Sequence, residues 1–398
     1  MASKYSTPYF LRKNTELTFF MNWIKNKSLI AYALKIINNK DMNFLAYSEK
    51  QQENFENVPL NPVDLLVLSW LSYFDFRPVI DNMPFKIKEL KEYKYYHSLD
   101  AYADSFLTKK SRKMMRNVVM SNRFQDMELL DYQLVFDKKR AIQFAALAVN
   151  LDHHIIIAYK GTDPSYIGWK EDFFISYKES LDSYSLAKDF YQRVVDKYQG
   201  PVILCGHSKG GHIATYVLTS IADTARIQLA YSFDGPGFRE NVFKGKEDLL
   251  KVYHKVVPQS SLVGVLFTNE EETEIIKSRN IMVFQHNPFE WQVRDNNFIP
   301  MKKRTYTSRY LDRAINGWIE SIDDQEKEKF TNILFDAFEN DFKAKDFNIF
   351  LHKFLLQGGP AWKAYLKLNK EDRKLFNSVV RRLIKNFIRP KKIEKKKD

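Results

Sequence analysis

The chain of 398 residues is long enough for one large domain or two ordinary ones. Its 44% hydrophobic and 15% aromatic residues can form a sizeable core, which excludes a globally disordered protein. The net charge of +13 is uneven, because residues 381–398 alone carry nine Lys or Arg against two acids. The remaining residues show no dense basic stripe interleaved with aromatic residues, so no nucleic-acid partner is expected.

Cysteine content and hydropathy bear on where the protein works. The single cysteine, Cys205, excludes an internal disulfide and favours a reducing compartment. The first residues lack the pattern of a signal peptide. No stretch approaches the ~18 uninterrupted apolar residues of a membrane-spanning helix. We therefore expect a soluble, cytoplasmic protein.

Composition and periodicity predict four segments. Residues 1–48 are expected to form a helical N-terminal extension, and residues 49–305 the main body. Within the main body, residues 77–122 are rich in Lys, Tyr and Met without clean periodicity, which suggests a helical cover over a pocket. Residues 306–390 show helical patterns, and residues 391–398 are expected to be a disordered basic tail with the charge to contact an anionic membrane peripherally.

The first half of the main body predicts one helix and a group of strands. Asn61-Pro62 supplies a plausible cap and first residue for a helix that runs towards Tyr73. Short turn-like segments separate three strand signals, which predicts an antiparallel meander. These strands are expected at residues 127–136, 141–149 and 154–159.

Strands and helices alternate in the second half, which predicts a mostly parallel sheet. The expected order is a helix at 183–198, a central strand at 202–205, a helix, a strand at 227–233, a helix and strand within 249–257 and a last short strand at 281–286. Further helices are expected at 308–322, 325–342, 347–356 and 370–388. The predicted fold class is α/β, a mostly parallel sheet with flanking helices, antiparallel first strands and a helical C-terminal region.

The most informative motif is Gly206-His207-Ser208-Lys209-Gly210, a G-x-S-x-G pentapeptide. An apolar run precedes it and a helical pattern follows it, as a nucleophile elbow requires. The two glycines lack the Cβ atoms that would clash where the chain folds back. This context predicts that Ser208 is a catalytic nucleophile, although small residues also recur in ordinary turns.

A serine nucleophile needs a general base, normally a histidine held by a carboxylate. Four histidines follow Ser208 in the chain: His212, His254, His286 and His352. The first lies one turn into the elbow helix, the second inside a regular element and the last in the helical tail. His286 lies between an apolar run and a Pro turn, so it is the predicted base, against the alternative of an ordinary hydrogen-bonded loop histidine.

The predicted acid is Asp234, in the segment Ser232-Phe-Asp-Gly-Pro-Gly-Phe238. It ends the strand after the elbow helix, and active sites of α/β proteins form at the carboxyl ends of parallel strands. The alternative is that Asp234 merely caps its own turn. A competing segment, Pro258–Gly264, offers serines rather than a carboxylate.

Two backbone amides are expected to hold the oxyanion. Lys209 follows the nucleophile and supplies the first. The second is expected from Thr162, in Tyr159-Lys-Gly-Thr-Asp163, where Gly161 allows close approach. Asp172 is expected to be a structural partner of the elbow.

Together these segments resemble the class 3 (fungal-type) lipases, and more closely an uncharacterised bacterial branch of that group. The resemblance rests on Tyr159–Asp163, Gly168–Asp172, Gly206–Gly211, Phe233–Phe238, Pro258–Gly264 and Gln285-His286. It implies an α/β-hydrolase fold and a serine esterase mechanism with no cofactor and no metal. By the family pattern Ser208 is the nucleophile, Thr162 an oxyanion-loop residue and His286 the base.

One departure from the family concerns the acid. Typical class 3 lipases carry it after the strand that here leads into Pro258-Gln-Ser-Ser261, where no carboxylate stands. Asp234, one strand earlier, would have to take its place. The expected function is hydrolysis of small-molecule or lipid esters through an acyl-enzyme. The alternative is a catalytically inactive interaction or membrane-docking module with the same fold, and thioesterases, peptidases and acyltransferases use the same constellation.

Overall fold

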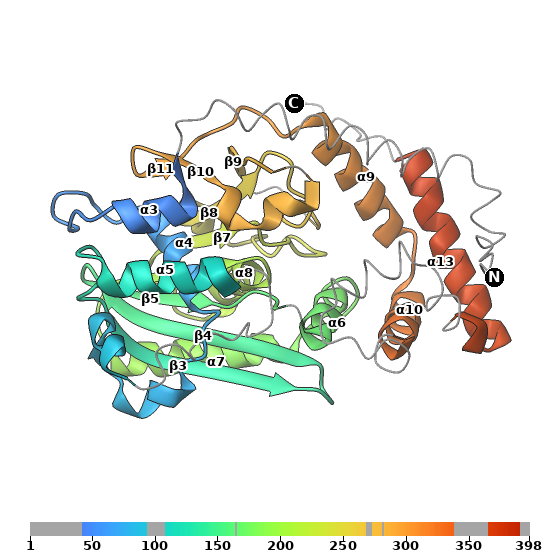
Figure 1. Cartoon of the computed structure of the whole chain (residues 1–398). Helices are drawn as coiled ribbons and strands as arrows, with labels where there is room; N and C mark the ends of the chain where they lie inside the picture. The colour runs from blue at the N-terminus through green and yellow to red at the C-terminus, as the bar shows by residue number, and fades with distance from the viewer. Residues whose placement is uncertain are drawn as a thin grey trace, which may run out of the picture.

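An eight-stranded sheet forms the centre of the molecule in a computed structural model, which describes residues 42–93, 108–163, 165–267, 273–280, 282–337 and 365–390. The strand order follows the chain from β2 to β9 (Figure 1). The strands are β2 (Phe85–Lys86), β3 (Glu128–Asp137), β4 (Ile142–Leu151), β5 (His154–Tyr159), β6 (Val202–His207), β7 (Ile227–Phe233), β8 (Tyr253–Pro258) and β9 (Thr273–Ile276).

The sheet changes direction at β5. Strands β2 to β5 pair antiparallel, and β5 to β9 pair parallel. The predicted meander and the predicted mostly parallel α/β class are therefore confirmed. Helices connect β5 to β6 and β6 to β7, and a 3-10 helix, Glu247–Lys251, lies between β7 and β8.

Strand β6 is buried on both faces, which explains its uninterrupted apolar run. Alternate residues point to opposite sides of the sheet. Ile203 and Cys205 lie in one apolar cluster, whereas Val202 and Leu204 lie in another. Cys205 is fully buried and unpaired, so it packs as a small apolar residue.

Helices α3, α4 and α5 pack over the first cluster. They span Phe44–Lys50, Pro62–Leu71 and Thr108–Met120. The expected cap of α4 is present, since the Asn61 side chain accepts hydrogen bonds from the amides of Val63 and Asp64. Asp64 in turn forms a fully buried ion pair with Arg123 at 2.6 Å, which ties the start of α4 to the segment after α5.

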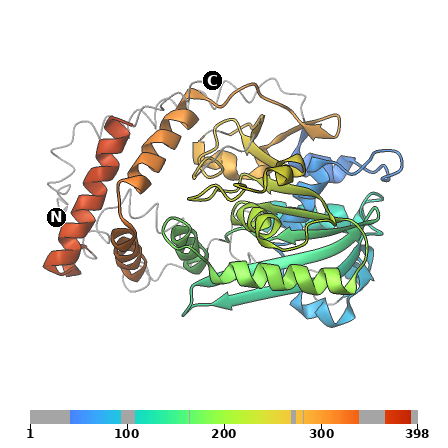
Figure 2. The ribbon, with the colours of Figure 1, turned by 180° about the vertical axis from the view of Figure 1, so that it is seen from behind.

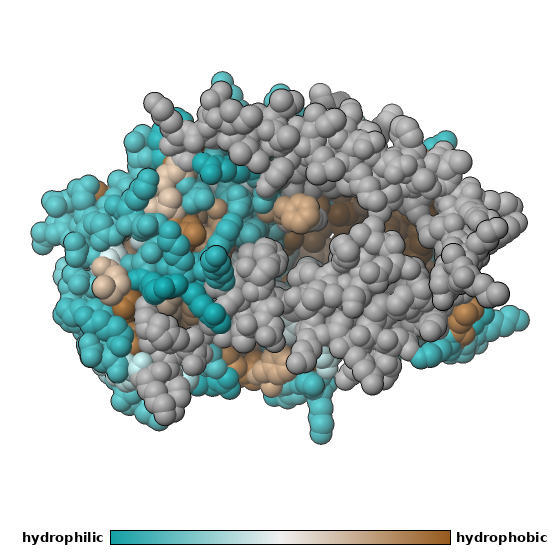
Figure 3. All heavy atoms as spheres, in the orientation of Figure 1, coloured by the Kyte–Doolittle hydropathy of each residue, from teal (hydrophilic) through white to brown (hydrophobic). Residues whose placement is uncertain are grey.

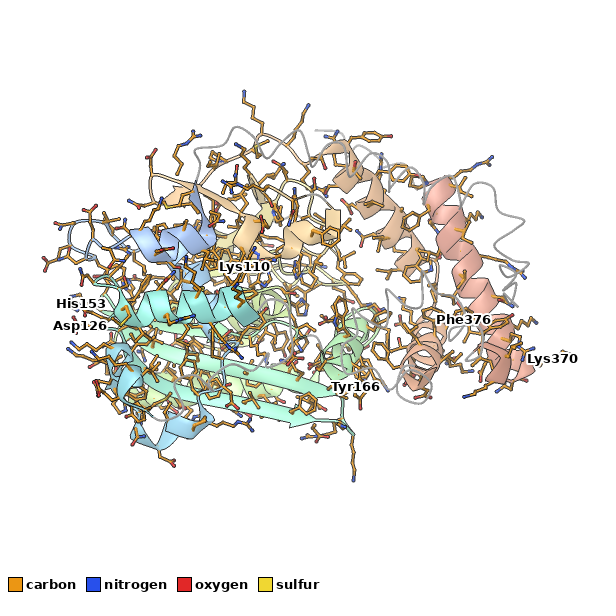
Figure 4. The ribbon with its side chains drawn as sticks, viewed as in Figure 1. Lys110, Asp126, His153, Tyr166, Lys370 and Phe376 are labelled. Atoms are coloured by element: carbon orange, nitrogen blue, oxygen red, sulfur yellow. The ribbon has the colours of Figure 1, made fainter. Side chains whose placement is uncertain are left out.

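Helices α7 (Asp182–Lys197) and α8 (Lys209–Ser220) cover the other face and contribute to the second cluster. Figure 2 shows α7 running along this side of the sheet. Helix α6 (Tyr166–Phe174) lies beside the start of β4, where the Gln143 amide donates to Glu171, and its Tyr166 is labelled in Figure 4. Between these layers the carboxyl ends of β6, β7 and β8 meet at one edge.

A second, three-stranded sheet lies beside the first. It joins β1 (Met42–Asn43), β10 (Gln292–Arg294) and β11 (Asn297–Phe298). Short 3-10 helices occupy Arg77–Asn82, Ile87–Glu92, Glu247–Lys251, Met282–His286 and Pro288–Glu290. Of the predicted N-terminal extension, residues 1–41 lie outside the described residues.

The C-terminal region contributes α9 (Tyr306–Glu320), α10 (Asp324–Ala337) and α13 (Lys370–Ile388). These helices stand together to one side of the sheet (Figure 1). Phe330 of α10 stacks on Phe376 of α13, labelled in Figure 4, with ring centroids 5.6 Å apart. The Trp318 indole of α9 donates to the Val379 carbonyl at 3.1 Å. The helix predicted at 347–356 and the tail at 391–398 lie outside the described residues.

One sequence prediction is wrong. The last strand expected at 281–286 is a 3-10 helix, Met282–His286. The buried Gln285 side chain accepts from the Ser260 amide, and its carbonyl accepts from the Trp291 indole. Both contacts hold Gln285 inward while Phe284 is 67% exposed, so the apolar run does not form a strand.

The predicted cover at 77–122 is described only in part, because residues 94–107 lie outside the described residues. The described part consists of two 3-10 helices, strand β2 and α5. These elements pack on the first cluster, against α3 and β3, so a cover over the cavity stays a prediction. Within the described part of the chain, no helix is long and apolar enough to cross a membrane.

Candidate active site

Ser208 occupies a tight turn between β6 and α8. Its backbone has φ +59° and ψ −132°, a conformation that non-glycine residues seldom adopt. The turn is possible because its flanking residues are glycines. A Cβ at Gly206 would lie 2.2 Å from the Gly210 carbonyl carbon, and a Cβ at Gly210 would lie 2.0 Å from the Tyr159 oxygen. The motif is thus required by close backbone packing at this turn.

Ser208, His286 and Asp234 form one hydrogen-bonded line. The Ser208 hydroxyl lies 2.8 Å from His286 Nε2, and His286 Nδ1 lies 2.7 Å from Asp234 Oδ2. A carboxylate oxygen accepts hydrogen bonds, so Nδ1 carries the hydrogen. Nε2 is then left to accept from the serine, which is the arrangement a general base needs.

Asp234 is fully buried at the end of β7, in a positive-φ conformation of +51°. Its second oxygen, Oδ1, accepts from the Ser261 hydroxyl and from the Gly264 amide. The carboxylate therefore does more than cap its own turn. The loop after β8, where the resemblance would place the acid, instead supplies the donors that hold Asp234 from the neighbouring strand.

His207, inside the pentapeptide, contacts the backbone of the histidine that faces the serine. Its Nε2 lies 2.8 Å from the His286 carbonyl, which only accepts, so Nε2 is the donor. Its Nδ1 accepts from the Tyr73 hydroxyl at 3.1 Å. Burial, with a smaller effect of His286, lowers the pKa of His207 well below its usual range, so His207 is neutral.

The loop after β5 lies against the serine turn. A Cβ at Gly161 would lie 2.0 Å from the Tyr73 hydroxyl oxygen and 2.4 Å from the His207 carbonyl oxygen, so the expected close approach is observed. The Thr162 hydroxyl donates to the Asp172 carboxylate, 2.8 Å from each oxygen. Asp172, the expected structural partner of the elbow, instead accepts this hydrogen bond from Thr162.

Asp172 belongs to α6 and faces the cavity beside Ser208. Burial raises the pKa of its carboxyl group to about 6, although the charge of Lys209 and the Thr162 hydrogen bond oppose the shift. This carboxyl group therefore changes its protonation state near neutral pH.

The side chain of Lys209 lies in a buried polar cluster. Its Nζ lies 2.5 Å from Glu171 Oε2 and 2.7 Å from the Gln143 carbonyl. Neither charged side chain is more than 2% exposed. This ion pair joins the first turn of α8 to α6, so it fixes the loop that carries Thr162 relative to Ser208.

The other histidines considered from the sequence lie elsewhere. His212 is buried and bonded to the Tyr184 hydroxyl at 2.5 Å. His254 pairs with Glu274 at 2.8 Å on the far part of the sheet. His352 is outside the described residues. Among the residues that the structure describes, no group of three or more His, Cys, Asp or Glu side chains could hold a metal ion.

An apolar cavity of about 290 Å³ opens beside Ser208 and His286. Twelve of its twenty lining residues are apolar, and most of them come from α6, the loop after β8, α9 and α10. Figure 3 shows strongly hydrophobic atoms inside a hollow on this face of the molecule. The C-terminal helices thus supply one wall of the cavity, and Ser308 of α9 donates to the Ser261 carbonyl to hold that wall on the site.

Sequence reasoning missed His207, Tyr73, Glu171 and Gln143 as parts of the site. His207 lies inside the motif, so a variable position of the pentapeptide was the signal that could have found it. Tyr73 and Gln143 come from distant elements, and no local pattern marks them.

A mostly parallel sheet with a serine–histidine–aspartate line at its carboxyl edge defines a lipase-like α/β-hydrolase fold. The chain belongs to the Mbeg1-like family, whose model matches residues 118–336. This match confirms the resemblance to lipase-like hydrolases stated from the sequence.

Two solved structures are similar to part of the chain. One, described as "Crystal structure of M37 lipase", is 16% identical with a TM-score of 0.33 and covers 50% of this chain and 68% of its own. The other, the propeptide complex of Rhizomucor miehei lipase, is 15% identical with a TM-score of 0.31 and covers 54% and 67%. No curated protein matches the chain.

Proposed function

We propose that the protein is a serine hydrolase that cleaves carboxylic esters of apolar acyl groups through an acyl-enzyme. The observation that carries the proposal is the line from Ser208 through His286 to Asp234, with distances of 2.8 and 2.7 Å. Its orientation leaves His286 Nε2 as acceptor of the serine proton. The line opens onto an apolar cavity, as an acyl substrate requires.

In the first step Ser208 Oγ attacks the ester carbonyl carbon while His286 Nε2 takes its proton. The carbonyl oxygen becomes an oxyanion, for which we assign the amides of Lys209 and Thr162 as donors. The carbon–oxygen bond to the leaving alcohol then breaks, and His286 returns the proton to that alcohol. Water, deprotonated by His286, releases the acid by the same steps in reverse order.

Asp234 keeps the imidazole in the productive tautomer through Nδ1. The neutral His207 fixes the His286 backbone, so the ring is held from both its side chain and its main chain. Asp172 holds the Thr162 side chain, which orients the oxyanion loop. The esters acted on are those of small molecules or lipids, and a cytoplasmic location remains a prediction.

Fluorophosphonate labelling of the purified protein tests this proposal, because the probe reacts with activated serines. We expect wild type to label, and Ser208→Ala and His286→Ala to lose labelling. Ser260→Ala is a matched control, since Ser260 lies near the site but bonds Thr305 rather than the acid. A wild type that does not label, with detergent present, would favour the alternative of an inactive interaction module.

A further inference from the structure

The apolar cavity beside Ser208 ends at a second cavity of different chemistry. The second cavity has a volume of about 780 Å³, and seven of its fourteen lining residues are charged. The two share five lining residues: Ser176, Phe267, Ile319, Ile322 and Lys327. None of these five belongs to the Ser208–His286–Asp234 line, so the junction is separate from the reacting groups.

Lys327 of α10 supplies the charge at the junction. Its side chain is 11% exposed and donates to Asp324 Oδ1 at 3.0 Å. Arg239 donates to the other oxygen, Asp324 Oδ2, at 2.8 Å. Two cations thus share one carboxylate where the apolar walls of the first cavity meet the charged chamber.

The size of the first cavity limits the length of the acyl chain that it can hold. A water-sized group occupies roughly 30 Å³, so a cavity of about 290 Å³ holds on the order of ten such groups. A saturated chain that begins at the ester carbonyl therefore fills it with about eight to ten carbons. Any longer chain would place methylene groups among the ions of the second chamber.

We propose that this cavity is a binding site for medium-length acyl chains, about eight to ten carbons long, and that Lys327, where the cavity adjoins the second one, sets the length limit. The inference rests on the proposed esterase function for its kinetics, but the binding site itself does not. Each methylene buried against the apolar walls raises kcat/KM by about fourfold, equivalent to ~0.8 kcal/mol. A methylene beside Lys327 gains no such burial and displaces solvent from an ion pair.

The test compares a series of p-nitrophenyl esters, from acetate to palmitate, on wild type and three variants. Lys327→Met removes the junction charge and extends the apolar wall, while Asp324 keeps its bond to Arg239. Ile319→Trp fills the first cavity where it adjoins the second. Lys329→Met is the matched control, because Lys329 is an exposed lysine two residues along the same helix and lines neither cavity.

For wild type we expect kcat/KM to rise about fourfold for each added methylene and to stop rising near ten carbons. Lys327→Met should continue to gain with longer chains, by at least tenfold for the myristoyl ester relative to wild type. For Ile319→Trp, kcat/KM should stop rising at shorter chains, and Lys329→Met should show the same chain-length profile as wild type. A Lys327→Met variant that labels with fluorophosphonate and keeps the wild-type profile would overturn the proposal.

A second measurement does not depend on catalysis. Trp169 and Trp318 line the cavity, so their fluorescence reports on binding of free fatty acids to Ser208→Ala. Affinity should increase with chain length up to about ten carbons and then level off, and Lys327→Met should remove the levelling. If no ester is cleaved but this profile is seen, the serine hydrolase proposal fails and the acyl site stands. If affinity does not depend on chain length, the acyl site fails even where esters are cleaved.

Discussion

His207 donates from Nε2 to the main-chain carbonyl of His286 at 2.8 Å, so the residue before the serine holds the backbone of the histidine that faces it. The two rings also lie 4.7 Å apart. The pentapeptide therefore positions both the proposed nucleophile and its base. Errors of about 1 Å in such positions can cost roughly a hundredfold in rate.

Replacing His207 tests this positioning role. His207→Phe keeps a ring but loses the donor, so we expect kcat to fall by roughly 10- to 100-fold with little change in KM. His207→Gln can still donate an amide hydrogen and should recover part of the loss. Steady-state kinetics on a soluble ester measures both constants. A rise in KM with kcat unchanged would contradict a role in holding His286.

The loop after β8 offers a matched pair of serines. Ser261 donates to Asp234, whereas its neighbour Ser260 bonds the Thr305 hydroxyl. Ser261→Ala removes one donor from a buried carboxylate, so kcat should fall by about tenfold, equivalent to ~1.4 kcal/mol. Ser260→Ala should change kcat by less than about twofold. Equal effects in the two variants would show that the loop acts through general packing alone.

The raised pKa of Asp172 predicts a pH-dependent stability. The folded protein holds this proton more tightly than the unfolded chain, whose carboxyl has a pKa of 3.8. The favourable contribution of the Asp172 carboxyl group to the stability of the fold is therefore complete at a pH below its unfolded-state pKa. This contribution is lost as the pH rises through about 6. Asp172→Asn removes this titrating carboxyl group, so the stability of the variant relative to wild type should increase by roughly 3 kcal/mol across that pH range.

Urea unfolding midpoints of both proteins at several pH values measure this difference. Asp163→Asn serves as a control in which the pH dependence of stability should have the opposite sign. Despite burial, the charge of Lys160 lowers the pKa of Asp163, so that carboxylate stabilises the fold above its unfolded pKa. Asp163→Asn should accordingly lose stability relative to wild type as the pH rises. A stability difference between Asp172→Asn and wild type that does not change with pH would contradict a raised pKa of Asp172.

The buried pair of Lys209 and Glu171 predicts non-additive mutations. Lys209→Met leaves the Glu171 carboxylate buried without its cation, which should cost about 3 kcal/mol of the free energy of unfolding. Adding Glu171→Leu removes the orphaned charge and should restore most of that loss. Denaturant unfolding of the two single variants and the double variant closes the cycle. Additive losses would mean that the two charges do not interact.

Local patterns predicted most of the sheet and the residues that meet at its edge. The apolar run of β6 and the glycines around Ser208 carry their signals within a few residues, because burial and close backbone approach restrict residue type directly. Chain order and turn residues were enough to select His286 and Asp234, which the structure brings within 2.7 Å of each other. These features depend on local geometry, so the sequence expresses them.

The features that sequence reasoning missed depend on contacts between distant segments. The segment before His286 has the apolar residues of a strand, but the Ser260 amide and the Trp291 indole hold Gln285 inward and make it helical. Tyr73 reaches His207 across 134 positions of sequence, and no periodicity marks such a contact.

The carboxylate beside His286 depends on two successive strand ends: Asp234 follows β7, and Ser261 and Gly264, which donate to it, follow β8. Both ends converge on the same point in space. The negative charge that the histidine needs is therefore a property of this edge of the sheet rather than of one strand.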